Sequence, residues 1–125
     1  MSKILITYCD QGVAEIHKRN FQKEGLETVV VPDEKDVLDV VEKEKIDIVL
    51  IGMNMNGFEI AKKIRKNNQG IKIYIIGVGD SLILKENQEK AIESGANDFI
   101  DVVHVAPDKT CDIIMGRIVN EEQSN

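Results

Sequence analysis

Three aspartates follow short apolar runs in this sequence, at places where carboxylates could hold a metal ion or transfer protons. Asp10, Asp80 and Asp101 each come shortly after a run rich in β-branched residues. Such runs are typical of buried strands, and the carboxyl ends of parallel strands meet at one edge of a sheet. The acids therefore have two readings, a metal or acid–base site, or separate solvated loop acids and helix caps. No His or Cys stands at ligand spacing beside them, which favours the second reading.

Two cysteines and two histidines are the other reactive groups. Cys9 and Cys111 form no CxxC motif, which predicts free thiols in a reducing compartment. Cys9 precedes a helix start, where the pKa of a thiol can fall, so a reactive thiol is an alternative to an inert one. His17 and His104 have no acid or nucleophile beside them in the sequence and are interpreted as structural. The turn "GVGD" (77–80) lacks the Lys of a phosphate-binding loop, so its glycines are assigned to backbone geometry.

Short apolar runs alternate with amphipathic segments along the whole chain. We expect strands over residues 3–8, 27–31, 46–52, 71–77 and 97–103. A helix is expected after each strand, and the inward-facing residues of four of these helices are predicted to be Val13, Ile16 and Phe21; Ile60, Ala61 and Ile64; Ala91 and Ile92; and Ile113, Ile114 and Ile118. Strict alternation predicts an α/β fold of the flavodoxin-like type, a three-layer sandwich with a parallel sheet. We expect one domain over 1–121 and a frayed tail over 122–125.

Composition and charge limit the function classes. With 125 residues, 42% of them hydrophobic and 30% charged, the chain can bury its own core. The net charge of −6 disfavours nucleic acid and anionic membranes as partners, because both attract an excess of Lys and Arg. No run approaches the ~20 apolar residues of a membrane span, and the start lacks a signal peptide, so we expect a cytoplasmic protein. No sequence motif indicates a cofactor or a metal ion.

Several stretches together resemble the receiver domain of response regulators, the CheY-like family of two-component phosphorelay signalling. They are "KILITYCDQ", "KEGLETVVVPDEKDVLDVVEKEKIDIVLIG", "GFEIAKKIR" and "AIESGANDFID", and the resemblance covers about residues 3–120. It implies a five-stranded sheet in the order 2-1-3-4-5 with five helices, two on one face and three on the other. It also places Phe99 at the position of the family's aromatic switch residue.

The residues that carry out phosphorylation in that family are absent at the matching positions. The family has an acidic pair after the first strand, a phosphate-accepting Asp after the third, a hydroxyl after the fourth and a Lys followed by Pro after the fifth. Carboxylates hold Mg²⁺ there, and the metal and the Lys balance the charge of the phosphoryl group. This sequence has, in that order, Tyr8 and Cys9, Gly52, Gly77 and Val102, with Val103 in place of the Pro.

Two further departures concern register and loop length. If the first strand were one residue longer, Cys9 and Asp10 would fill the acidic pair, which makes Asp10 a candidate metal ligand. Without other ligands Mg²⁺ would gain little there, because it sheds water reluctantly. The loop from Gly52 to Gly57 is about three residues shorter than is usual in the family, and the loop after Gly77 is about three longer.

We interpret the chain as a pseudo-receiver, a phosphorylation-independent protein–protein interaction and signalling module without enzymatic activity. By resemblance, an unknown protein partner should contact the fourth helix, fifth strand and fifth helix, about residues 82–120, and the domain should be a monomer or a weak homodimer. Phe99 should be fixed inward, and the peptide between Val102 and Val103 should be trans because no Pro lowers the cost of cis. One alternative is a flavodoxin-like domain that binds a small ligand with its remodelled strand-end loops. The other is an enzyme that uses Cys9, for which the sequence identifies no base.

Overall fold

A parallel five-stranded sheet forms the centre of the molecule. The structure, a computed structural model, describes residues 2–78, 81–102 and 105–124. The strands lie in the order β2-β1-β3-β4-β5, and every neighbouring pair is parallel. Their bounds are β1 (Lys3–Thr7), β2 (Glu27–Val30), β3 (Ile48–Gly52), β4 (Lys72–Gly77) and β5 (Asp98–Asp101). The predicted fold class, strand order and alternation are confirmed, and each strand is one to three residues shorter than its apolar run.

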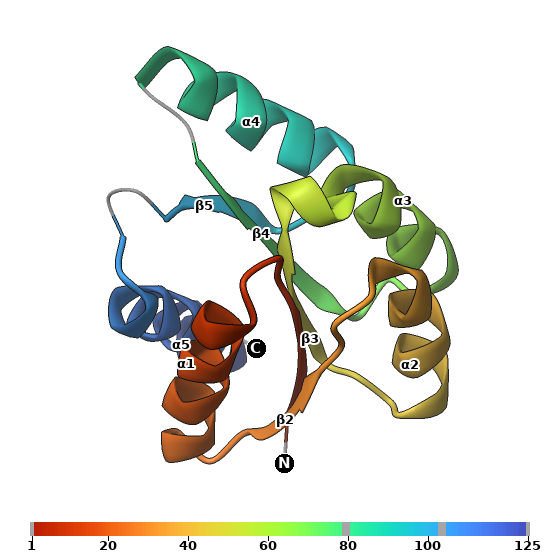
Figure 1. Cartoon of the computed structure of the whole chain (residues 1–125), viewed down its shortest axis with the longest axis vertical. Helices are drawn as coiled ribbons and strands as arrows, with labels where there is room; N and C mark the ends of the chain where they lie inside the picture. Colours follow the sequence, from red (N-terminus) through yellow and green to blue (C-terminus); the bar gives the residue numbers. More distant parts are fainter. Residues whose placement is uncertain (1, 79–80, 103–104, 125) are drawn as a thin grey trace.

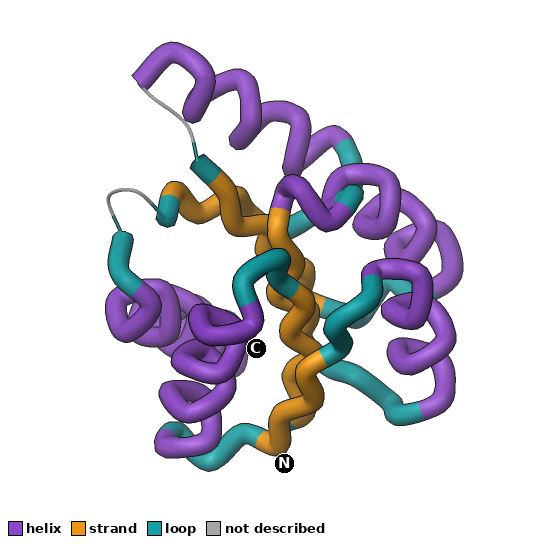
Figure 2. Tube along the Cα trace, in the orientation of Figure 1, coloured by secondary structure: helices purple, strands orange, loops and turns teal. Residues whose placement is uncertain are grey.

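Helices cover both faces of the sheet. They are α1 (Gln11–Lys23), α2 (Val37–Lys43), α3 (Gly57–Asn67), α4 (Ser81–Glu93) and α5 (Pro107–Ser124), and short 3₁₀ turns, η1 (Glu34–Asp36) and η2 (Met53–Met55), precede α2 and α3. Figure 1 shows α1 and α5 together on one face and α2, α3 and α4 on the other. Figure 2 shows the same arrangement as an inner layer of strands between outer layers of helices. This is the predicted division of two helices and three.

Each face of the sheet has its own core, because alternate residues of a strand point to opposite sides. Ile4 and Ile6 of β1 pack with Ala14 and Phe21 of α1 and with Ile114 of α5. On the other face, Leu5 of β1 packs with Val37 of α2, Ile60 of α3 and Ala91 of α4. β3 is buried at every residue, as a central strand covered on both sides requires.

Two inward positions predicted from the sequence are wrong. Ile16 of α1 is 44% exposed, and Ile92 of α4 is 57% exposed. The buried stripe of α1 is instead Ala14, His17 and Phe21. A stripe with this spacing of three and four turns its neighbour Ile16 away from the sheet, and Ala91 does the same to Ile92. Apolarity alone therefore placed one exposed neighbour on the inner face of each helix, while Phe21 and Ala91 were placed correctly.

Helix α5 continues to Ser124, so it includes residues 122–124 of the segment that we predict to fray. Fraying of this segment stays a prediction. Residues 117–124 include good helix formers and no Gly or Pro, so local propensity does not stop the helix at residue 121.

Candidate functional site

The parallel strands bring the predicted site residues together at their carboxyl edge. Gly52 ends β3 and pairs with Ile76, and Gly77 ends β4 and pairs with Asp101. The amide of Val102 donates to the carbonyl of Gly77 at 2.9 Å, which fixes the end of β5 beside β4. Tyr8 and Cys9 follow β1 directly. The structure thus gathers the five positions that the family resemblance selected.

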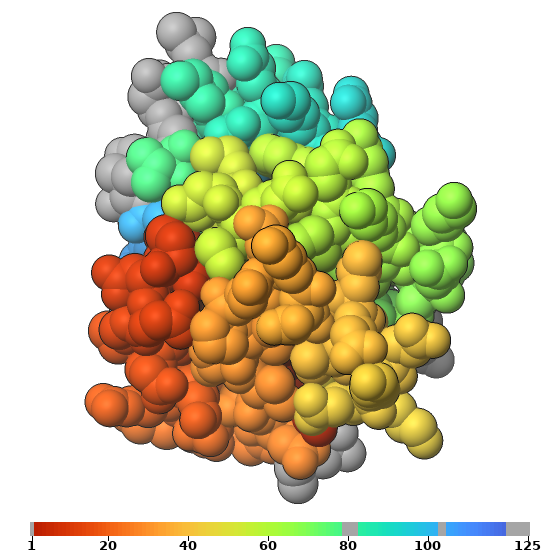
Figure 3. Space-filling model, turned by 45° about the vertical axis from the view of Figure 1, so that its right-hand side comes forward, coloured from red at the N-terminus to blue at the C-terminus, as the bar shows by residue number. Residues whose placement is uncertain are grey.

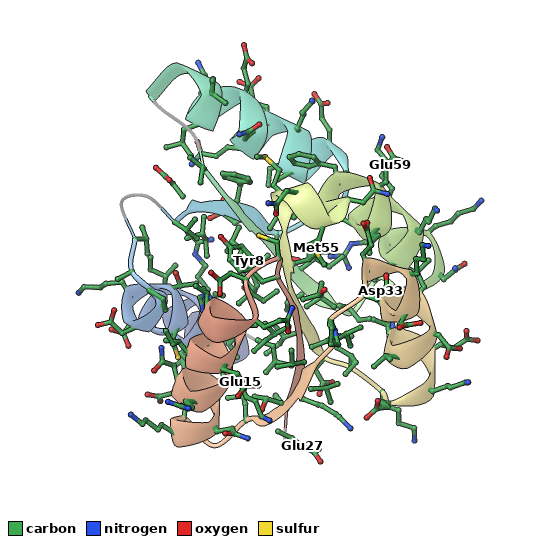
Figure 4. All side chains as sticks on the ribbon, in the orientation of Figure 1. Tyr8, Glu15, Glu27, Asp33, Met55 and Glu59 are labelled. Atoms are coloured by element: carbon green, nitrogen blue, oxygen red, sulfur yellow. The ribbon has the colours of Figure 1, made fainter. Side chains whose placement is uncertain are left out.

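The Tyr8 ring lies against Gly52. A Cβ atom built on Gly52 would be 2.9 Å from Cδ1 of Tyr8, 3.1 Å from Oδ1 of Asn54 and 3.4 Å from Cγ of Met55. Contacts below 3 Å force neighbours to move, and here the nearest atom belongs to a rigid ring. Figure 4 shows Tyr8, which follows β1, and Met55 of η2 at this edge. The end of β3 therefore has no room for a side chain unless Tyr8 moves.

Phe99 and Met53 fill the space at Gly77 in the same way. A Cβ atom on Gly77 would be 2.9 Å from Cβ of Met53 and 3.0 Å from Cζ of Phe99. The Phe99 side chain is 2% exposed, so the ring points inward as the sequence predicted. Burying such a ring stabilises the fold by about 1.5–3 kcal/mol.

The shortened loop after Gly52 makes this packing possible. It is reduced to η2 and one residue, Asn56, which has φ 59° and ψ 36°. Asn tolerates this left-handed conformation better than most residues. Gly57 then approaches β3 so closely that a Cβ on it would be 2.9 Å from the carbonyl oxygen of Gly52. The packing roles of Met53 and Asn54 were not predicted from the sequence. The short spacing between Gly52 and Gly57 is the feature that could have indicated them.

Cys9 and Asp10 have ordinary local roles in this structure. Cys9 is exposed, and its Sγ accepts a hydrogen bond from Nδ2 of Asn54 at 3.2 Å. Asp10 caps α1, because its Oδ1 accepts the amide of Val13 at 3.1 Å. Among the described residues, no group of three or more His, Cys, Asp or Glu side chains could hold a metal ion.

One further expectation at this edge needs correction, and others lie outside the described residues. Asp101 was grouped with solvated loop acids, but it is only 6% exposed, because β5 is covered up to its last residue. Asp80, Val103 and His104 are not among the described residues, and neither is the peptide bond between residues 102 and 103.

His17 is the most strongly perturbed titratable group beside the site. It is fully buried on α1, and its ring meets the Tyr8 ring edge to face, with centroids 6.4 Å apart. Neither ring nitrogen has a hydrogen-bond partner among the described residues. Burial lowers the pKa of His17 from 6.5 to about 4, since the charged imidazolium loses its hydration. Burial, with Cys9 and Asp10 nearby, also raises the pKa of Tyr8, so its hydroxyl is neutral near pH 7.

A small hollow adjoins the filled edge. It measures about 270 Å³ between α3 and α4 and is lined by residues that include Met53, Asn56, Phe58 and Lys90. The ammonium group of Lys90 lies 5.7 Å from the centroid of the Phe58 ring. Small-molecule sites usually measure about 300–1,000 Å³, so this hollow is smaller than such a site usually is.

Comparison with known proteins identifies the family of this arrangement. Residues 4–102 match the response regulator receiver domain. The chain belongs to this family. Response regulators are signalling proteins that interact with other proteins such as kinases and effectors. Among the described residues, no helix is long and apolar enough to cross a membrane.

Two curated relatives come from Bacillus subtilis. The transcriptional regulatory protein YxdJ is 31% identical over 104 residues, which are 81% of this chain and 44% of YxdJ. Sporulation initiation phosphotransferase F is 32% identical over 91 residues, which are 70% of this chain and 73% of the relative. The receiver domain thus spans less than half of YxdJ and about three quarters of the phosphotransferase.

Solved structures show the same fold at lower identity. A CheY-like receiver domain protein from Methanospirillum hungatei has a TM-score of 0.83 and 23% identity, covering 100% of this chain and 99% of its own. An atypical orphan response regulator, described as having a phosphorylation-independent regulatory mechanism, has a TM-score of 0.80 and 16% identity, covering 92% and 93%.

Packing at the two strand-end glycines predicts the effect of adding one methyl group. We expect Gly52→Ala and Gly77→Ala each to lower the free energy of unfolding by about 1–3 kcal/mol, because both positions are already filled. Gly116→Ala is the matched control: nothing lies within 4 Å of a Cβ there, and Ala favours helix α5 by up to about 1 kcal/mol. Urea denaturation measures all three. If the Tyr8 ring causes the loss of stability, Gly52→Ala should lower the free energy of unfolding by less in a Tyr8→Ala background. A Gly52→Ala variant that is as stable as Gly116→Ala would contradict the packing described here.

Burial of His17 predicts a loss of stability on mild acidification. The pKa in the folded state is about 4 and in the unfolded state 6.5, so the unfolded chain binds more protons between these values. The contribution of neutral His17 to the free energy of unfolding is therefore fully present well above pH 6.5. It is lost as the pH is lowered, by about 1 kcal/mol between pH 7 and pH 5.5. Denaturation of the wild type and of His17→Leu at both pH values measures this. The variant should lose this part of the pH dependence, and an equal slope in both proteins would show that His17 is not its source.

Proposed function

We propose that this domain is a pseudo-receiver, which works in two-component signalling by binding a protein without being phosphorylated. The observation that carries the proposal is the packing of Tyr8 on Gly52, at the position where receivers accept phosphate. A phosphorylated Asp needs both a side chain at this strand end and open space in front of it. Here the residue has no side chain, and a ring with a neutral hydroxyl stands in that space.

The electrostatics of the edge support the same proposal. Transfer of a phosphoryl group requires cations that balance its negative charge. The positions assigned by resemblance to the metal-binding acids, the hydroxyl and the Lys hold Tyr8, Cys9, Gly77 and Val102. None of these side chains supplies a charge that binds Mg²⁺ or replaces the Lys. The proposed module therefore has no catalytic residue and needs no cofactor.

Packing around Phe99 explains how such a module could signal. We assign the aromatic switch position of the family to Phe99, whose ring is held against Gly77 and Met53. A ring already buried needs no phosphate to draw it inward, so the surface above it keeps one shape. The proposed partner surface is the face of α4, β5 and α5. Ile83 and Ile92 are exposed on α4, and Arg117 of α5 pairs with Asp98 of β5.

The wider setting of the proposal follows from the relatives. One structural neighbour is described as an orphan regulator with a phosphorylation-independent mechanism, which gives the fold a precedent for this behaviour.

The free thiols Cys9 and Cys111 suit a reducing cytoplasm, where we place the protein. We propose that it is a monomer or a weak homodimer that meets its partner through the α4–β5–α5 face.

Incubation with acetyl phosphate and Mg²⁺, followed by intact-mass spectrometry, tests the proposal. The wild type should show no adduct of about 80 Da, the mass of a phosphoryl group. Gly52→Asp should also show none, because its carboxylate would meet Tyr8 and no cation would assist the transfer; losing even one such group costs about 10²–10³ in rate. A receiver that carries the Asp is the positive control. A wild-type adduct that maps to Asp10 or Asp101 would overturn the proposal.

A further inference from the structure

Arg65, in the last turn of α3, joins the end of that helix to the turn between α4 and β5. Its Nε donates a hydrogen bond to the carbonyl of Gly95 at 2.8 Å, and its Nη2 donates to Oδ1 of Asn97 at 3.1 Å. Its Nη1 donates to the carbonyls of Asn68 and Gln69, just beyond α3, at 3.3 Å and 3.0 Å. We call these four hydrogen bonds the Arg65 clamp. Figure 3 shows the surface of α3 (yellow-green) beside that of α4 (turquoise).

The turn after α4 is shaped to receive this side chain. Gly95 has φ 96°, and a Cβ atom on it would be 2.8 Å from Cγ of Arg65 and 2.9 Å from Cβ of Arg65. Only a residue without a side chain permits so close an approach. Oδ1 of Asn97 accepts a second hydrogen bond from the amide of Ile73 at 2.8 Å, and the amide of Asn97 donates to the carbonyl of Ile73 at 2.7 Å. Asn97 thus connects Arg65 to β4 as well.

The charge of Arg65 serves to hold the chain. Among the described residues Arg65 forms no ion pair, and all its hydrogen-bond acceptors are carbonyl or amide oxygens. Partial burial lowers the pKa of Arg65 from its usual value, because the guanidinium loses hydration, but the group stays charged near pH 7. Hydrogen bonds from a charged donor are roughly twice as strong as those between neutral groups.

The part of α4 from residue 83 to residue 93 buries little apolar surface. Together with the residue that follows it, its inward side chains are one partly buried leucine and three small or polar groups, Leu84, Asn87, Ala91 and Ser94. Nδ2 of Asn87 has no hydrogen-bond partner among the described residues. Ile83 and Ile92 of the same helix are exposed. Because apolar burial is the usual force that holds a helix on a sheet, this part of α4 depends on polar contacts such as the Arg65 clamp.

We propose that Arg65 is a positioning residue for the partner surface, which holds α4 and β5 in one arrangement without a phosphoryl group. Gly95 and Asn97 lie between the two elements, so the guanidinium fixes the place where they meet. Phe99 packs on Gly77 within the same strand. The start of β5 is thus held by Arg65 and its middle by Phe99. The role of the α4–β5–α5 face as partner surface rests on the proposed function, whereas the clamp itself can be tested without a partner.

Amide hydrogen exchange of the ¹⁵N-labelled protein, followed by NMR, tests the clamp. In Arg65→Ala the amides of residues 95–97 should exchange about tenfold or more faster than in the wild type, because the lost hydrogen bonds come from a charged group. The amides of β1 should change less, since the opening is local. Lys66→Ala is the matched control, because Lys66 is an exposed cation in the same turn of α3, and its exchange rates should equal those of the wild type. Equal acceleration in β1 and at residues 95–97 would show a general loss of stability and overturn the proposal.

The variant Arg65→Lys separates the geometry of the clamp from its charge. It keeps the cation and most of the aliphatic stem but loses the planar fork of donors. We expect it to fold and still to accelerate exchange at residues 95–97, because one ammonium group does not replace the fixed pair of hydrogen bonds to Gly95 and Asn97. Exchange rates equal to those of the wild type in Arg65→Lys would contradict the clamp.

Relaxation-dispersion NMR of the wild type and of both Arg65 variants measures the state of the partner surface. The amides of residues 83–99 should report one state in the wild type and exchange on the microsecond to millisecond timescale in the variants, because α4 is no longer fixed at its end. No such exchange in either variant would overturn the positioning role, since a merely structural residue lowers stability without creating a second state. A phosphoryl adduct on the wild type would instead overturn the proposed function and leave these exchange results unchanged, so the two failures are distinct.

Discussion

The ring of Tyr8 occupies the space into which any side chain at Gly52 would project, and the arrangement of the carboxyl edge depends on this contact. Tyr8 can lie there because β3 ends in glycine, and β3 can end in glycine because Tyr8 fills the gap. The neighbouring strand repeats the relation, with Phe99 and Met53 packed on Gly77. In a close-packed interior such pairs are mutually dependent, since a change in either partner leaves a void or a clash.

This packing changes the physical character of the edge. An acidic cleft that binds a metal ion must stay open and hydrated, whereas the edge described here is closed by aromatic and thioether groups. The short connection through η2 and Asn56 draws α3 toward β3, until Gly57 approaches the carbonyl of Gly52. In the function we propose, this packing leaves neither the room nor the charge that phosphate chemistry requires. We infer that the domain signals by its presence and shape, through a surface that stays in one state.

Much of the fold followed from local patterns in the sequence, and much of the site did not. The apolar runs predicted β1 to β5 because burial on both faces of a central sheet leaves a strong signal in composition. Their order in the sheet came from the resemblance to the receiver family. Helical faces were less certain, since Ile16 and Ile92 are apolar yet point to solvent. At the site, the sequence indicated Gly52 and Gly77 as missing side chains and Phe99 as an inward ring, but not Tyr8 and Met53 as groups that pack on the two glycines. These contacts join segments far apart in the chain, so no local pattern encodes them. The burial of Asp101 depends in the same way on the cover of β5.

The most direct test of the central claim is an NMR titration of the ¹⁵N-labelled protein with beryllofluoride and Mg²⁺, which together imitate a phosphoryl group on a receiver. A receiver that carries the acceptor Asp provides the positive control. If Tyr8 and Phe99 close the carboxyl edge, the amide signals of Gly52, Gly77 and Phe99 should stay unchanged at every concentration. Saturable shifts at these residues would show that the edge still admits a phosphoryl analogue, and would contradict the account.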